Sequence, residues 1–332
     1  MMKLSVMLRV DSAVDDDGRS RIADRILGQW EHDPGSARFA RSSANFVYVF
    51  SKGNERFFLR FADSSERSAA EIGAEMALLR WVASQGMAVT TPVASNNGRD
   101  VETVETDMGV FSAVVFAALQ GVQFDIEELN AAQFEVWGAT LGKLHATLRL
   151  YQGPTASVRR TWRDSLEMVR CSIPADELRV QAEYEYLAAW LAALPVTATN
   201  YGLIHGDFEL DNLFWQDETL AMLDFDDCSY WWYGTDVAFA LRDLFADGVD
   251  LDNPSLQAFI RGYRTHAALD EKHVAQLPIW MRLANLLAYA KLLRTMDLAK
   301  DQAVPEWVPS LLSKLENWIH NYKTSLLSIP MG

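Results

Sequence analysis

Two acidic segments stand out in the sequence: HGDFELDN at residues 205–212 and DFDD at residues 224–227. The stretch between them, LFWQDETLAML, has two short apolar runs around a polar turn and therefore predicts a β-hairpin. Such a hairpin would bring Asn212 and Asp224 to the same end, although they lie twelve positions apart in the chain. The pattern thus predicts a single site in which these two residues lie close to Asp207.

These three residue types suit the transfer of a phosphoryl group. That reaction requires the acceptor hydroxyl to be positioned and the phosphates to be neutralised by metal. The amide oxygen of Asn212 and the carboxylate of Asp224 are hard ligands of the kind that Mg²⁺ prefers. Asp207 is then free to accept the proton of the hydroxyl, or to orient it. Either segment alone would be weak evidence, because His-Gly-Asp occurs by chance and acidic runs are usually solvated turns. Together with the hairpin they predict a phosphotransferase.

Residues 205–236 resemble the aminoglycoside phosphotransferase and choline kinase family, which comprises protein-kinase-like small-molecule kinases. The resemblance implies that Asp207 is the catalytic residue, that Asn212 and Asp224 hold Mg²⁺, and that ATP is the phosphate donor. It also implies that Asp236 pins the catalytic loop at the start of a helix, as its family counterpart does.

The same resemblance implies an α+β fold of two lobes. Residues 1–117 would form an antiparallel, β-rich nucleotide-binding lobe, and residues 118–332 a mainly helical lobe for catalysis and substrate binding. Backbone groups near Val115 and Ala117, at the end of the first lobe, would contact the adenine.

The first third of the chain contains the strand patterns that such a lobe requires. Strands are predicted at residues 46–50, 56–61, 101–106 and 110–117. The small polar segment before the first of them occupies the place of the family's phosphate-covering loop, with Ser43 and Asn45 as the candidate phosphate contacts. This segment contains no glycine, so its backbone has less freedom to wrap closely around phosphates.

Arg60 lies at the strand position where the family commonly has a lysine for the α- and β-phosphates. Arginine is always charged and can grip phosphate with two donors. The next helix is predicted to begin with a capping box of Asp63 and Glu66 and to end near Val82. Glu75 lies on or beside the apolar face of this helix, and a carboxylate there needs a cationic partner. We therefore expect an Arg60–Glu75 ion pair, although Glu75 reaching water remains an alternative.

The rest of the chain is predominantly helical in its periodicity. Helices are predicted at residues 127–151, 161–171, 174–193, 235–247, 253–269, 271–299 and 306–326. His145, within the first of these, is expected to be buried and hydrogen-bonded rather than catalytic.

Acidic and aromatic side chains crowd the predicted acceptor region. They are Glu209, Asp211, Asp226, Asp227, Trp231 and Trp232. Such a region suits a cationic alcohol, through charge attraction and cation–π contact. The alternative is that the aromatic residues simply pack the core of the helical lobe.

Composition sets further limits. The chain has 332 residues, and its net charge of −15 argues against nucleic acid or an anionic membrane as a partner. The two cysteines and the mixed composition of the first ten residues lead us to expect a cytoplasmic protein. No stretch is apolar for long enough to predict a membrane span.

The sequence therefore predicts an ATP- and Mg²⁺-dependent kinase that transfers the γ-phosphate to a hydroxyl of a small molecule. Two alternatives stay open: a metal-dependent phosphoesterase and a non-catalytic nucleotide-binding scaffold. The sequence does not choose among aminoglycoside-, choline- and homoserine-like acceptors, and it does not indicate an oligomeric state.

Overall fold

The computed structural model describes residues 1–153, 159–246, 248–299 and 303–327. Within these ranges the chain divides into two compact units. Unit 1 consists of residues 1–120 together with Gly153 and residues 295–299. Unit 2 consists of the rest of the described chain. No helix in the described ranges is both long and apolar enough to cross a membrane.

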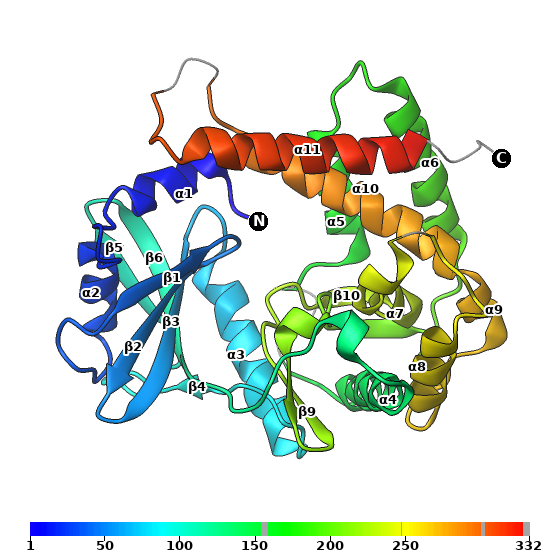
Figure 1. Ribbon diagram of the computed structural model, residues 1–332, viewed down its shortest axis with the longest axis horizontal. Coiled ribbons are helices and arrows are strands. Elements are labelled where there is room, and N and C mark those ends of the chain that lie inside the picture. Colours follow the sequence, from blue (N-terminus) through cyan, green and yellow to red (C-terminus); the bar gives the residue numbers. More distant parts are fainter. Residues whose placement is uncertain (154–158, 247, 300–302, 328–332) are drawn as a thin grey trace. The chain divides into compact units, whose positions relative to one another are not determined.

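Unit 1 contains an antiparallel sheet with strand order β1-β2-β3-β6-β4, and β5 also pairs with β6 (Figure 1). The strands are β1 (Arg38–Ser42), β2 (Phe46–Lys52), β3 (Glu55–Asp63), β4 (Pro92–Val93), β5 (Glu102–Thr106) and β6 (Gly109–Ala117). The four predicted strands are confirmed as β2, β3, β5 and β6. The aromatic and β-branched residues that indicated them favour the pleated, half-buried surface of a sheet.

The two faces of this sheet carry different residues, because successive side chains of a strand point to opposite sides. Arg60 is paired with Val47 and Val114, so these three lie on one face. Phe57 and Phe50 are cross-strand partners on the other face, and their rings stack with centroids 5.5 Å apart.

Three helices accompany the sheet in unit 1: α1 (Leu4–Asp11), α2 (Arg21–Leu27) and α3 (Ala69–Ser84). Figure 1 shows α2 and α3 on opposite sides of the sheet. The predicted start of α3 was wrong, since its capping box consists of Ser68 and Glu71. Asp63 instead ends β3, where its carboxylate accepts hydrogen bonds from the backbone and hydroxyl of Ser65 and pairs with Arg9.

Unit 2 is mainly helical, as predicted. Its α-helices are α4 (Ala131–Leu148), α5 (Trp162–Ser172), α6 (Leu178–Ala193), α7 (Tyr233–Ala240), α8 (Pro254–Arg264), α9 (Glu271–Ala275), α10 (Leu277–Thr295) and α11 (Val308–Leu327), with 3₁₀ turns at Ile126–Glu128, Leu210–Asn212 and Asp243–Phe245. Two short antiparallel pairs complete it, β7 (Tyr201–Ile204) with β10 (Ser229–Trp232) and β8 (Leu213–Gln216) with β9 (Thr219–Met222). The single helix predicted at residues 271–299 is interrupted at Gln276, between α9 and α10.

Helices α4 and α8 pack with their backbones in close contact. A Cβ added at Gly138 would lie 1.9 Å from the carbonyl oxygen of Phe259, and one at Gly142 would lie 2.4 Å from that of Tyr263. Gly262 on α8 approaches α4 just as closely. Only glycine fits at these three positions, so the sequence sets the separation of the two helices.

Candidate active site

The segment around Asp207 forms a compact loop between β7 and β8. Its 3₁₀ turn places the side chain of Asn212 next to Asp207. The amide Nδ2 of Asn212 donates to the carboxylate Oδ2 of Asp207 at 2.8 Å and to its backbone oxygen at 2.9 Å. Two of the three predicted chemistry residues are therefore in direct contact.

The β8–β9 hairpin brings the third residue to the same end, as predicted. Leu213 pairs with Met222, and the backbone N–H of Leu223 donates to the carbonyl oxygen of Asn212 at 3.0 Å. Asp224 follows directly and has a backbone φ of 63°, in the left-handed region. Residues other than glycine seldom adopt that conformation, and such strain often occurs at functional sites.

The donor chemistry at this end of the hairpin fits a magnesium ion. Asn212 can supply a neutral amide oxygen and Asp224 a carboxylate, which is the small protein ligand set that Mg²⁺ uses when phosphates complete its coordination. Within the described residues no group of three or more His, Cys, Asp or Glu side chains could hold a metal by itself.

Asp236 on α7 fixes the backbone of the loop that carries Asp207. Its two carboxylate oxygens accept from the backbone N–H groups of His205 and Gly206, both at 2.8 Å, and from His145 Nε2, also at 2.8 Å. Burial would raise the pKa of Asp236, but these hydrogen bonds and the His145 ring hold it below its ordinary value. The predictions that Asp236 pins the loop and that His145 is buried and hydrogen-bonded are confirmed.

Gly206 is required where the loop passes the acidic segment. Its φ is 84°, and a Cβ at this position would lie 2.6 Å from the carbonyl oxygen of Asp227. The loop and the segment Asp224–Asp227 are therefore packed backbone to backbone, which brings Asp227 close to Asp207. Burial raises the pKa of Asp207, and the Asp227 carboxylate raises it further, whereas His205 and Lys291 lower it.

Two carboxylates of the predicted acceptor region are engaged with cations. Glu209 pairs with Arg242, which follows α7, and Asp227 Oδ2 lies 2.8 Å from Nζ of Lys291 on α10. Of the other two carboxylates in this region, that of Asp211 is exposed and that of Asp226 is partly buried.

The structure does not support the predicted substrate contacts of Trp231 and Trp232. Both side chains are buried, and Trp232 packs against Trp162 and Trp280 while its Nε1 donates to the carbonyl oxygen of Pro195. The alternative given above, that these aromatic residues pack the core, agrees with the structure.

Glu209 should make activity depend on pH near neutrality. Burial raises its pKa to about 7, although Arg242 acts in the opposite direction, so the carboxyl is largely protonated at pH 6 and ionised at pH 8. For a cationic acceptor we expect kcat/KM to rise across this interval as the negative charge develops. Glu209→Gln should remove that rise. Measured pH profiles of the two proteins test this, and parallel profiles would show that Glu209 does not face the acceptor.

Unit 1 contains the predicted ion pair between strand and helix. Arg60 Nη2 donates to Glu75 Oε2 at 2.7 Å, and both side chains are buried. Arg67 also approaches the same oxygen, at 2.9 Å. Burial would raise the pKa of Glu75, but the two arginines hold it below its ordinary value. The guanidinium of Arg60 also lies over the ring of Phe116, 5.3 Å from its centroid.

The other predicted nucleotide contacts lie on the same sheet. Ser43 and Asn45 belong to the tight turn between β1 and β2, where Ser43 N–H donates to the Asn45 carbonyl at 3.2 Å. Because β1 extends to Ser42, the segment predicted to cover the phosphates is the tight turn that joins β1 to β2. Ala117 is the exposed last residue of β6, whereas Val115 is buried within the sheet.

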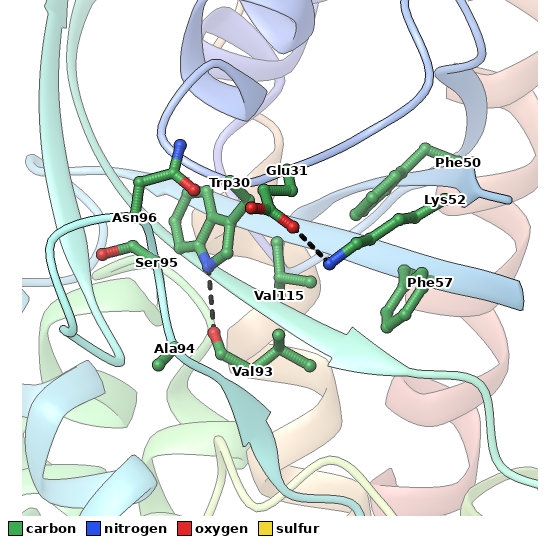
Figure 2. Close-up of a pocket in the computed structure, with 10 residues that line it drawn as sticks. All are labelled: Trp30, Glu31, Phe50, Lys52, Phe57, Val93, Ala94, Ser95, Asn96 and Val115. Carbon is green, nitrogen blue, oxygen red and sulfur yellow. Dashed lines mark hydrogen bonds and ion pairs between the residues drawn. The ribbon is translucent and has the colours of Figure 1, made fainter.

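A pocket in unit 1 lies on the sheet face opposite Arg60. It has a volume of about 500 Å³, and Figure 2 shows the aromatic rings of Trp30, Phe50 and Phe57 around it. Trp30 Nε1 donates to the Val93 carbonyl at 2.9 Å. The side chain of Val115 also lines this pocket. Only backbone groups of Val115 could therefore serve a nucleotide on the Arg60 face.

The Arg60–Glu75 pair should control nucleotide affinity. We expect Glu75→Gln to weaken ATP binding about tenfold, equivalent to about 1.4 kcal/mol, because Arg60 loses the partner that orients it. Arg60→Lys should be tolerated and Arg60→Ala should not. The double variant Arg60→Ala/Glu75→Gln should cost less than the sum of the single changes, since neighbours in one network are not additive. Calorimetric ATP titrations test this, with the exposed Glu105→Gln as control. Strict additivity would mean that the two residues act separately.

Comparison with known proteins finds relatives that are named as kinases. Amicoumacin kinase of Bacillus subtilis (strain 168) is 28% identical over 271 residues, which cover 79% of this chain and 81% of that protein. Homoserine kinase of Beijerinckia indica is 28% identical over 179 residues, or 51% of this chain and 54% of that protein.

Solved structures share the fold. An amicoumacin kinase in complex with AMP-PNP, Ca²⁺ and Ami superposes with a TM-score of 0.79 at 23% identity, covering 98% of this chain and 96% of the other. A microcompartment-associated aminopropanol kinase gives a TM-score of 0.69 at 22% identity, with coverage of 92% and 97%.

The fold and these relatives define the protein as a kinase-like phosphotransferase of small molecules with a protein-kinase-like fold. The chain belongs to the phosphotransferase enzyme family, whose model matches residues 36–271. The family and the fold predicted from the sequence are thereby confirmed.

Three cations at these sites were not predicted from the sequence: Arg67, Arg242 and Lys291. Arg67 directly precedes the N-cap of α3, so the correct helix start would have indicated it. Arg242 and Lys291 lie 33 and 64 residues from their partners and have no local pattern that marks them.

Proposed function

We propose that the protein transfers the γ-phosphate of ATP to a hydroxyl group of a small amino-bearing molecule in a Mg²⁺-dependent reaction. The observation that supports this most strongly is the contact of Asp207 with Asn212, with Asp224 held at the same end of the hairpin. An acceptor base and two metal ligands of the right chemistry thus lie in one unit.

Each residue has a distinct role in this proposal. Asp207 orients the acceptor hydroxyl and accepts its proton, while the hydrogen bond from Asn212 fixes the carboxylate. Asn212 and Asp224 would hold the magnesium ion, which when bound neutralises charge on the phosphates. Arg60, aimed by Glu75, binds phosphate oxygens in unit 1. This ion pair favours a kinase over a phosphoesterase, which would have no use for it.

The acceptor class follows from the relatives and from the charges near Asp207. Relatives are named for amicoumacin, homoserine and aminopropanol. We propose an acceptor that carries an amino group as well as the hydroxyl, since carboxylates surround Asp207.

A screen for acceptor-dependent ADP release tests the proposal. Amino alcohols, hydroxy amino acids and antibiotics with free hydroxyls would each be supplied with ATP and Mg²⁺. We expect release above the acceptor-free rate with at least one compound, and a phosphorylated product by mass spectrometry. Release of inorganic phosphate without a phosphorylated product would instead indicate a hydrolase.

The metal role has its own test in Asp224→Asn. Asparagine tolerates the left-handed backbone of residue 224, so this change removes the charge and leaves the conformation in place. We expect the magnesium-dependent part of the ATP affinity to be lost, because a carboxylate ligand has become neutral. Calorimetric titrations with and without Mg²⁺ measure it, with Asp217→Asn, the other aspartate at positive φ, as control. An unchanged magnesium dependence would move the ligand role to Asp226.

A further inference from the structure

Two ion pairs lie beside the catalytic carboxylate within unit 2. The first joins Arg242 to Glu209, two residues beyond Asp207, and the second joins Lys291 to Asp227, whose backbone packs against Gly206. Both cations also interact electrostatically with Asp207. The pKa of Lys291 is raised chiefly by Asp227 and also by Asp207. Burial acts to lower the pKa of Arg242, but Glu209 and then Tyr322 and Asp207 raise it.

Above the pKa of Glu209, which burial raises to about 7, the charges of these four side chains cancel. Glu209 and Asp227 contribute two negative charges, and Arg242 and Lys291 two positive charges. The acceptor region is therefore less acidic than its carboxylates suggest, and it presents groups of both signs.

The pairs are also accessible enough to exchange partners. The side chains of Lys291 and Asp227 are 44% and 39% exposed, and those of Arg242 and Glu209 are 35% and 19% exposed. A ligand with one positive and one negative group can pair with one side chain of each ion pair, and the displaced partners are exposed enough to turn to water. A ligand with ammonium groups alone must approach two fixed cations, and like charges brought together are strongly unfavourable.

We propose that Arg242 and Lys291 are specificity-determining residues that select a hydroxyl acceptor carrying both an ammonium and a carboxylate over one carrying ammonium groups alone. This inference rests on the proposed transfer to a hydroxyl, because it concerns the acceptor of that reaction. It narrows the acceptor class to zwitterionic hydroxy amino acids and their derivatives.

Matched acceptors test the proposal. Homoserine and 3-aminopropanol share a hydroxyl and an ammonium and differ by one carboxylate. We expect kcat/KM to be about tenfold or more higher for homoserine, the equivalent of a single favourable charge contact. Lys291→Met or Arg242→Met should reduce the ratio of the two kcat/KM values about tenfold. Lys291→Arg, which conserves the charge, should retain it.

A matched control separates this local effect from a change in net charge. Arg261 on α8 pairs with Glu135 at 3.8 Å and its side chain is 59% exposed, so Arg261→Met removes the same charge elsewhere on unit 2. The ratio should stay at the wild-type value in this variant. A ratio that favours 3-aminopropanol in the wild type, or one that moves equally in all three methionine variants, overturns the proposal. Variants that melt earlier yet keep the wild-type ratio would show purely structural ion pairs, and this also overturns it.

A binding measurement distinguishes failure of this inference from failure of the proposed function. Calorimetric titration of both compounds into wild-type protein with AMP-PNP and Mg²⁺ requires no turnover. Tighter binding of homoserine in this titration, together with no phosphorylated product when ATP is supplied instead, would support the specificity and refute the phosphotransfer. Equal binding, or no binding of either compound at millimolar concentration, refutes the specificity itself.

Discussion

Asp207→Asn should reduce turnover by about 10²–10⁴-fold, which is the usual contribution of a general base. The ATP affinity should stay nearly unchanged, because the role proposed for Asp207 concerns the acceptor and not the phosphates. The substitution keeps the size of the side chain and its place beside Asn212 Nδ2. Steady-state acceptor kinetics and ATP titrations of the same preparation measure both quantities.

Asp217→Asn is the control for this change. Asp217 lies in the turn between β8 and β9, its side chain is exposed, and the substitution removes the same charge within unit 2. Its turnover should remain close to that of the wild type. If Asp207→Asn retained more than about a tenth of the wild-type rate, the proton would have to leave by another route.

Asp236→Asn should cost both stability and activity. The carboxylate accepts from two backbone N–H groups of the loop and from His145, and an amide can supply only one accepting oxygen in their place. Breaking a buried charged network of this kind typically costs about 3–5 kcal/mol in the free energy of unfolding. Urea unfolding measures the stability. The folded fraction should also turn over slowly, because the loop that carries Asp207 is no longer held.

The neighbouring Thr235 provides the control for burial. It is fully buried, and its hydroxyl has no hydrogen-bond partner within the described part of the chain. Thr235→Val should therefore change the unfolding free energy by less than about 1 kcal/mol, since it removes a hydroxyl that makes no bond there. Equal losses in the two variants would mean that residue 236 matters through packing and not through its hydrogen bonds.

Apart from the Asp236 contact, which the family resemblance implied, the parts of the site that could be predicted follow from patterns in short stretches of sequence. The hairpin between Asn212 and Asp224 follows from apolar runs around a polar turn, and the pair Arg60–Glu75 from a strand followed by a helix with one carboxylate on its buried face. Local patterns of this kind determine their own geometry, so the sequence was sufficient.

The errors arose where two local patterns competed or where no pattern existed. Asp63 with Glu66 and Ser68 with Glu71 both fit a capping box, and the extension of β3 to Asp63 decided between them. Lys291 reaches Asp227 only because α10 packs within unit 2, and periodicity along one helix does not reveal what its polar face meets. For Trp232 the sequence left both a substrate contact and core packing open, because aromatic residues serve cores and pockets equally well.

The glycine contacts between α4 and α8 have a consequence for catalysis. Tyr263, whose carbonyl touches Gly142, lies with its hydroxyl 2.7 Å from His145 Nδ1, and His145 in turn bonds Asp236. The separation of the two helices thus affects, through Tyr263 and His145, the position of Asp236 and of the loop that carries Asp207. A methyl group added at residue 142 would displace Tyr263 and, with it, His145 and Asp236. A change in a helix interface that no substrate touches would then lower the activity.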